Sequence, residues 1–135
     1  MPPPEGQYPI ELILTRQLAG QLAMPVFIVD AGGTLVFYNE AAERVLGRRF
    51  EETGAMTAAE WAEAFIPRDE TGRSLAPGAL PLMIALREQR PAHADFYIRG
   101  LDAVERSIEA TAFPLIGLAG RLVGAVVLFW ETSRG

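Results

Sequence analysis

The chain has 135 residues, half of them hydrophobic, and a formal net charge of −5 at pH 7. This length supports one hydrophobic core, so we expect a single domain. Its acidic balance and scattered arginines argue against a nucleic-acid or anionic-membrane surface, because counterion release requires clustered Lys and Arg. The lack of cysteine excludes disulfides, thiolate nucleophiles and Cys-ligated metal sites.

Residues 1–9 contain four prolines and predict a flexible, extended N-terminus. This stretch has no basic segment before an apolar core, so it does not resemble a signal peptide. The longest apolar run, residues 122–130, is far shorter than the roughly 20 residues of a membrane helix. We therefore expect a cytoplasmic protein that does not contact a membrane.

Leucine and isoleucine recur every four residues between residues 10 and 23, which predicts an amphipathic helix. This helix could cover the outer face of a sheet, and its broad apolar stripe could also pair with the same helix of a second chain. In a homodimer, the interface would consist of Ile10, Ile13, Leu14, Leu18 and Leu22.

Residues 24–39 predict an antiparallel β-hairpin. Val26–Val29 and Leu35–Tyr38 are apolar runs of strand length, and the Asp-Ala-Gly-Gly segment between them permits a tight turn. Neither run alternates between apolar and polar residues, so both faces of the sheet should be covered.

Two short helices are expected after the hairpin. Asn39 is suited to cap the first, which ends at Gly47. Thr57, followed three residues later by Glu60, forms a capping-box pattern at the start of the second. The connection between them, residues 50–54, is predicted to be a turn.

The rest of the chain predicts one loop, one helix and three strands. Residues 66–79 are polar and rich in Pro and Gly, and residues 80–89 form a longer helix that ends before Pro91. Strands are expected over residues 93–99, 104–113 and 122–130, with turns at residues 100–103 and 114–120. The last strand is almost wholly apolar, which is typical of a central strand covered on both faces.

With this order of elements, the sequence resembles a PAS domain, a sensory module of bacterial signalling proteins. The pattern Asp30-x-x-Gly33-x-Leu35-x-x-x-Asn39 matches the first hairpin of the family. Further matches in family order are Ala42, Gly47, Pro67, Asp69, Pro81, Leu82, Ile108, Glu109, Pro114, Leu115, Gly120 and Gly124. The resemblance covers about residues 22–132, most of the chain.

The resemblance implies an α+β fold: an antiparallel five-stranded sheet with short helices on one face and the N-terminal amphipathic helix on the other. We expect the PAS domain to span residues 24–132, followed by a short tail of residues 133–135. Two departures are Ala103, where the family often has Gly, and Glu131-Thr132, a reduced form of the closing Asp-x-Thr signature.

The implied function is sensing or signalling through protein–protein contact, without enzymatic activity. No catalytic output domain follows in this sequence, so we expect the signal to pass by contact with another chain, or the sequence to be part of something larger. The resemblance leaves open whether a signalling protein binds as a second partner and whether the domain binds a small-molecule ligand.

Each cofactor known in the family requires particular residues, which this chain has or lacks. Cysteine-adduct flavin and thioester-linked chromophores both require a cysteine, which the chain lacks. Haem-binding members carry a histidine on the helix before the third strand, whereas residues 80–89 contain none and His93 lies just beyond them. Haem and non-covalent flavin are not expected, although a flavin could stack on Trp61.

The remaining expectation is an apolar cavity between the sheet and the short helices. The candidate wall residues are Trp61, Phe65, Met83, Phe96, Arg106 and Ile108. Arg106 falls in an otherwise apolar row of its strand, so a buried guanidinium there would need an anion, from Asp69, Glu70 or a ligand carboxylate. It could instead lie at the rim of the sheet and reach water.

Two other function classes remain open from the residues alone. His93 and Asp95 share one face of a strand and could act as a base and its orienting carboxylate in a small pocket-containing enzyme or ligand carrier. Alternatively, the domain could be a dimerisation module with a filled core. Asp69 and Glu70 are adjacent acids in a polar loop, and we expect solvation there rather than a metal site.

Overall fold

The computed structural model describes residues 8–132, so the predicted flexible N-terminus up to residue 7 and the tail at 133–135 lie outside the described residues. The first half of the chain contains α1 (Ile10–Ala19), β1 (Val26–Asp30), β2 (Leu35–Tyr38), α2 (Glu40–Leu46), α3 (Phe50–Thr53), α4 (Ala58–Phe65), η2 (Pro77–Ala79) and α5 (Pro81–Glu88). The second half contains β3 (Ala92–Arg99), β4 (Glu105–Ile116), η3 (Leu118–Gly120) and β5 (Leu122–Glu131).

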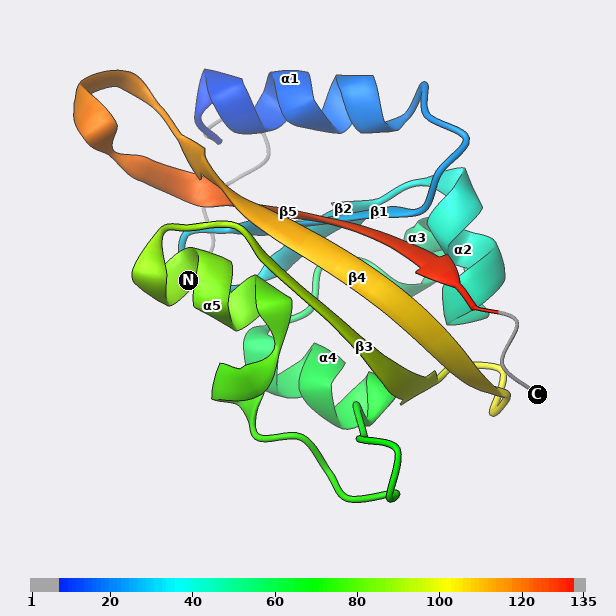
Figure 1. Cartoon of the computed structure of the whole chain (residues 1–135). Helices are drawn as coiled ribbons and strands as arrows, with labels where there is room; N and C mark the ends of the chain where they lie inside the picture. Colours follow the sequence, from blue (N-terminus) through cyan, green and yellow to red (C-terminus); the bar gives the residue numbers. More distant parts are fainter. Residues whose placement is uncertain (1–7, 133–135) are drawn as a thin grey trace.

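The five strands form one antiparallel sheet in the order β2-β1-β5-β4-β3. β1 and β5 pair over their whole common length, from Val26 opposite Leu128 to Asp30 opposite Gly124. The first and last strands of the chain therefore lie side by side at the centre of the sheet (Figure 1). This arrangement confirms the predicted five-stranded α+β fold and the central position of the last strand.

The turn between β1 and β2 forms as the Asp-Ala-Gly-Gly segment predicts. The Oδ1 atom of Asp30 accepts hydrogen bonds from the backbone N–H groups of Gly32 and Thr34, each at 3.0 Å. Gly33 has a φ angle of 88°, in the left-handed region where a side chain would be strained.

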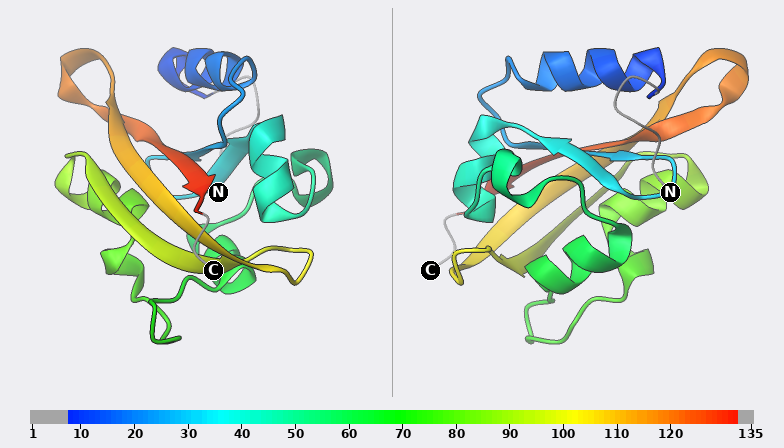
Figure 2. Two further views of the ribbon diagram at one scale, coloured as in Figure 1. Left: turned by 45° about the vertical axis from the view of Figure 1, so that its right-hand side comes forward. Right: turned by 180° about the vertical axis from the view of Figure 1, so that it is seen from behind.

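Both faces of the sheet are covered, and each cover makes its own apolar cluster. α1 lies across one face, where Leu12 and Ala19 pack with Val26, Ile28 and Val126. α2, α4 and α5 lie on the opposite face and enclose the larger cluster (Figures 1 and 2). The covering role of the N-terminal helix is therefore confirmed.

Helix α1 is shorter than predicted. It ends at Ala19 instead of residue 23, because Gly20 follows and the chain must turn toward β1. The side-chain amide of Asn39 donates to the carbonyl oxygens of Ala19 and Met24, both at 2.9 Å, which holds this turn in place. The carbonyl group of Ala19, which a longer helix would use internally, is thus bonded elsewhere.

Two other local predictions are wrong. The connection at residues 50–54 is a short helix, α3, whose first N–H, that of Phe50, donates to a carboxylate oxygen of Glu43 at 2.9 Å. β4 also continues through Pro114 to Ile116 instead of turning there. Because β3 begins at Ala92, opposite Ala112, it does not reach Pro114, and the free edge of β4 there tolerates a residue without an N–H group.

The helix caps predicted from the sequence are present. Asn39 accepts from the N–H of Ala42, and Thr57 and Glu60 form the capping box of α4. Gly47 ends α2 with a φ angle of 86°. These caps set where the helices begin on the inner face of the sheet.

Candidate functional site

An apolar cavity of about 80 Å³ lies between the sheet and helices α4 and α5. Its wall is built entirely from apolar and aromatic residues: Phe27, Leu46, Trp61, Phe65, Pro67, Leu80, Pro81, Leu82, Phe96, Ile98, Ile108, Ala110, Val127 and Phe129. Strands β1, β3, β4 and β5 supply the floor, because alternate residues of each strand point to the same face. Residues far apart in the sequence therefore meet in one hollow.

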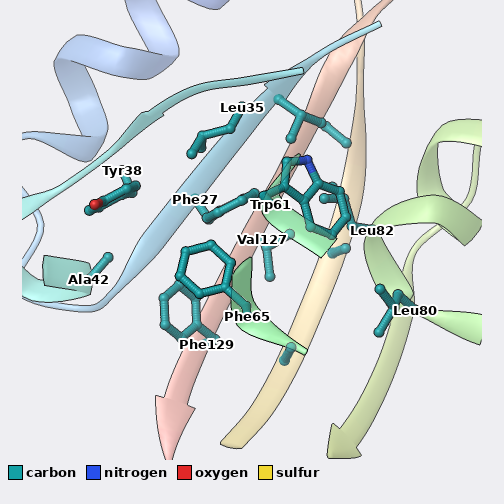
Figure 3. Packing of buried hydrophobic residues seen from close by; sticks show 14 of the residues in the cluster. Phe27, Leu35, Tyr38, Ala42, Trp61, Phe65, Leu80, Leu82, Val127 and Phe129 are labelled. Carbon is teal, nitrogen blue, oxygen red and sulfur yellow. The ribbon is translucent and has the colours of Figure 1, made fainter. Parts of the chain in front are cut away.

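Three aromatic rings pack against one another and form one side of the cavity (Figure 3). The ring of Phe27 meets Trp61 edge to face, with centroids 5.8 Å apart, and meets Phe65 in the same way at 6.4 Å. These are favourable aromatic geometries. The indole Nε1 of Trp61 donates to the carbonyl oxygen of Gly33 at 2.9 Å, so this buried donor is satisfied by the β1–β2 turn.

Four of the six candidate wall residues line this cavity: Trp61, Phe65, Phe96 and Ile108. Met83 and Arg106 lie outside the wall. On α5, Pro81 and Leu82 face the hollow, and Met83 is only partly buried. The position of a helix relative to a sheet decides which of several neighbouring apolar residues reaches a cavity, and the sequence of α5 does not contain that information.

Sequence reasoning missed the contributions of β1 and β5. Phe27, Val127 and Phe129 form much of the floor. Their strands are apolar on both faces, so the alternation that marks an inner face is hidden. The size of the side chains could have identified these residues. The large aromatic rings of central strands need room, and the face covered by the helices provides it.

Arg106 lies at the rim, where its anion comes from the protein. Its side chain is 14% exposed and binds the carboxylate of Asp102 through two nitrogens, at 3.1 Å and 2.9 Å. Its Nε lies 3.6 Å from a carboxylate oxygen of Glu131. The hydrogen bonds from Arg106 lower the pKa of Asp102 from its ordinary 3.8 to about 2. The expected alternatives, Asp69 and Glu70, are not its partners.

His93 and Asp95 lie on β3 but do not face the cavity. Phe96 and Ile98 of the same strand line the cavity, so the odd-numbered neighbours His93 and Asp95 point to the outer face. There the imidazole ring lies 6.1 Å from the ring of Trp130. The sheet therefore separates this base and carboxylate from the apolar cavity.

Asp69 organises its own loop. Its Oδ1 accepts from the hydroxyl and N–H of Thr71 and from the N–H of Arg73. These hydrogen bonds lower the pKa of Asp69, the hydroxyl contact most of all. Within residues 8–132, no group of three His, Asp or Glu side chains could hold a metal ion.

The comparison with protein families decides the identity. A family model described as the PAS fold matches residues 20–134. The chain belongs to the PAS family. PAS domains are sensory and signalling modules, generally not catalysts, and commonly mediate protein–protein interaction. The resemblance stated from the hairpin motif and the element order is thereby confirmed.

Solved structures show the same fold at low sequence identity. The PAS domain of a Colwellia psychrerythraea protein is 16% identical, with a TM-score of 0.64, and the match covers 90% of this chain and 98% of that chain. The PAS domain of nitrogen regulation protein NR(II) from Vibrio parahaemolyticus is 16% identical, with a TM-score of 0.60 and coverage of 88% and 98%.

A LOV protein from Rhodobacter sphaeroides is 13% identical, with a TM-score of 0.71, and the match covers 93% of this chain and 70% of that chain. The comparison with curated proteins found no match. No helix of the described residues is long and apolar enough to cross a membrane.

The residues of this PAS domain give the large cofactors of the family neither a cysteine nor a histidine that faces the cavity. A cavity of about 150 Å³ holds benzene, and the hollow here measures about 80 Å³. A flavin or a haem is several times larger than benzene. His93, which a haem would need as a ligand, points to the other face of the sheet.

Proposed function

We propose that this PAS domain is a cytoplasmic sensory module that works as a homodimer and transmits its signal by protein–protein contact. The observation that carries the proposal is the outward face of α1. Ile10, Leu14 and Leu18 of α1 are 62%, 56% and 62% exposed, and Leu22 in the turn after the helix is 42% exposed, whereas Leu12 on the inward side is 2% exposed. A helix that only covered a sheet would present polar residues on its outward side.

A second copy of the chain is the partner that best fits this surface. Full burial of a Leu or Ile side chain contributes about 1.5–3 kcal/mol, so a symmetric contact that covers the stripe on both chains has a substantial driving force. In a two-fold dimer the same patch meets itself, which suits a continuous apolar stripe. Ile13, which is half-buried, lies beside this stripe and completes the proposed interface.

The exposed apolar surface also extends beyond α1. The β4–β5 hairpin reaches the first turn of the helix, where Gly117 lies against the carboxylate of Glu11 (Figure 1). Leu118 at the tip of this hairpin is 85% exposed, and Ile116 is 46% exposed. These hairpin residues add to the exposed apolar surface, which is typical of interaction sites.

Light scattering of the purified protein at micromolar concentration tests the proposal. We expect a dimer mass for the wild type and a monomer mass for Leu14→Glu, which places a charge in the middle of the stripe. The matched control is Ala59→Glu, which introduces the same side chain at an exposed position of α4. A monomeric wild type, or a dimeric Leu14→Glu variant, contradicts the proposal.

A small ligand in the apolar cavity is the second part of the proposed function. Native mass spectrometry of the purified chain reports subunit count and bound mass in one spectrum. We expect the mass of a dimer and, where ligand is retained, an added mass per chain. Loss of that added mass on filling the cavity would link it to this site.

A further inference from the structure

The chemistry of the cavity wall restricts what it can bind. Among the side chains that line it, the indole nitrogen of Trp61 is the only heteroatom, and its hydrogen already goes to Gly33. The backbone carbonyl groups of two wall residues are also bonded: the oxygen of Pro67 accepts from Leu75, and that of Leu80 accepts from Ile84. The side chains of the wall therefore offer a ligand no unpaired hydrogen-bonding group.

The nearest arginines are also engaged. Arg106 is held by Asp102 and approached by Glu131. Arg68 follows Pro67 in the chain, and one of its terminal nitrogens lies 2.6 Å from a carboxylate oxygen of Glu105. Its buried Nε has no hydrogen-bond partner among the described residues, but Arg68 does not line the cavity. A carboxylate or phosphate that entered the hollow would be desolvated without a cation to pair with, which is strongly unfavourable.

A second hollow with a more polar lining borders the cavity. A shallow groove outside α4 shares Pro67 and Leu80 with the inner cavity and includes Glu63 and Ser74. A molecule whose apolar end fills the cavity could therefore leave between Pro67 and Leu80 and keep a polar end in water.

We propose that the cavity binds an uncharged, wholly apolar group, either a small hydrocarbon-like molecule or the end of a longer chain that leaves between Pro67 and Leu80. This inference rests on the proposed sensory function and names the chemical class of its ligand. It replaces the carboxylate ligand that Arg106 suggested. A hollow of about 80 Å³ is roughly half of a cavity that holds benzene, so the bound group is compact.

Methyl-detected NMR titrations of the full chain test the proposal with three probes. Xenon and cyclopropane represent the uncharged apolar group and are compact enough for the hollow, and cyclopropanecarboxylate carries the same ring with a charge. We expect saturable shifts of the methyl groups of Ile98, Ile108 and Val127 with both uncharged probes. The carboxylate should bind at least about tenfold more weakly, because its charge has no partner in the wall.

Variants assign the binding to this cavity. Ala110 is buried in the wall, so Ala110→Leu should fill the space and weaken xenon binding at least about tenfold. Ala59→Leu makes the same substitution at an exposed position of α4 and should leave xenon binding unchanged. If Ala110→Leu does not fold, Ala110→Val adds less volume and should still weaken binding.

Titration with 1-octanol distinguishes the end of a longer chain from a whole small molecule as the bound group. Tighter binding of 1-octanol than of cyclopropane, with additional shifts at Leu75, indicates the end of a chain, whereas tighter binding of cyclopropane indicates a whole small molecule. The inference is overturned if the folded wild type shows no saturable shift with xenon and cyclopropane, or if the carboxylate binds as tightly as cyclopropane. Light scattering of the same samples reports the dimer separately, so failure of one proposal is distinguishable from failure of the other.

Discussion

The side-chain amide nitrogen of Asn39 lies 2.9 Å from the carbonyl oxygen of Ala19, so the residue that caps α2 also holds the last residue of α1. Asn39 is 1% exposed and uses both ends of its amide. Its oxygen accepts from the N–H groups of Val26 and Ala42, and its nitrogen donates to the carbonyls of Ala19 and Met24. One side chain thus fixes the outer helix to the sheet.

Replacing this amide with a carboxylate should release α1. Asn39→Asp keeps the acceptor that caps α2 but places a charged oxygen against the carbonyl groups, and we expect the free energy of unfolding to fall by about 2–4 kcal/mol. Hydrogen exchange should show loss of protection in α1 and retained protection in α2. The control, Gln17→Glu, makes the same chemical change on the exposed side of α1. Unchanged protection of α1 in Asn39→Asp would contradict this role.

Removing the indole donor of Trp61 should leave a carbonyl group unpaired. Trp61→Phe keeps an aromatic ring in the cavity wall but deprives the oxygen of Gly33 of its 2.9 Å hydrogen bond. We expect a loss of about 1–3 kcal/mol in the free energy of unfolding, measured by urea denaturation followed by circular dichroism. Trp130→Phe on the outer face, where the ring is only partly buried, should cost less. Equal losses would show that ring size, not the hydrogen bond, dominates.

The Asp102–Arg106 pair predicts a specific acid dependence of stability. The folded-state pKa of Asp102 is lowered to about 2 from 3.8, so its ionised form stabilises the fold above pH 4, and this contribution is lost as the pH falls from about 4 to 2. We expect the difference in Tm between the wild type and Asp102→Asn to be largest at neutral pH and to shrink across this range. Glu63→Gln, at an exposed position of α4, serves as the control. A difference independent of pH would exclude this linkage.

Two glycines with nearly the same φ angle allow the cost of backbone strain to be distinguished from the cost of steric crowding. Gly47 and Gly72 have φ angles of 86° and 89°, but a Cβ atom on Gly47 would lie 2.6 Å from Cγ of Asp102, whereas Gly72 is surrounded by open space. We expect Gly72→Ala to cost about 1 kcal/mol and Gly47→Ala about 3 kcal/mol, by chemical denaturation. Similar costs would mean that the turn containing Asp102 moves aside freely.

The elements that the sequence predicts correctly are those whose signals are local. The β1–β2 turn depends on Asp30 and Gly33, which are three residues apart, and the capping box of α4 depends on Thr57 and Glu60. The central position of β5 was predictable because a strand that is apolar on both faces must be covered on both. The length of α1 was not, because its end depends on Asn39, twenty residues further along the chain.

The candidate site was predictable only in part, for the same reason. Phe96 and Ile108 were identified because alternation marks the inner face of their strands, whereas Phe27 and Phe129 come from strands without alternation. The side of β4 on which Arg106 lies was predictable from the alternation of that strand. Its pairing with Asp102 was not, because it depends on how the β3–β4 turn folds back.

The amino-acid sequence by itself determined the family, the order of the elements and the caps and turns, because these depend on side chains within a few residues of one another. Only the tertiary structure decided which face of α1 stays exposed, which anion Arg106 binds and which side chains enclose the cavity. These outcomes depend on contacts between segments far apart in the chain, and such contacts are set by how whole elements pack rather than by the pattern of any one of them.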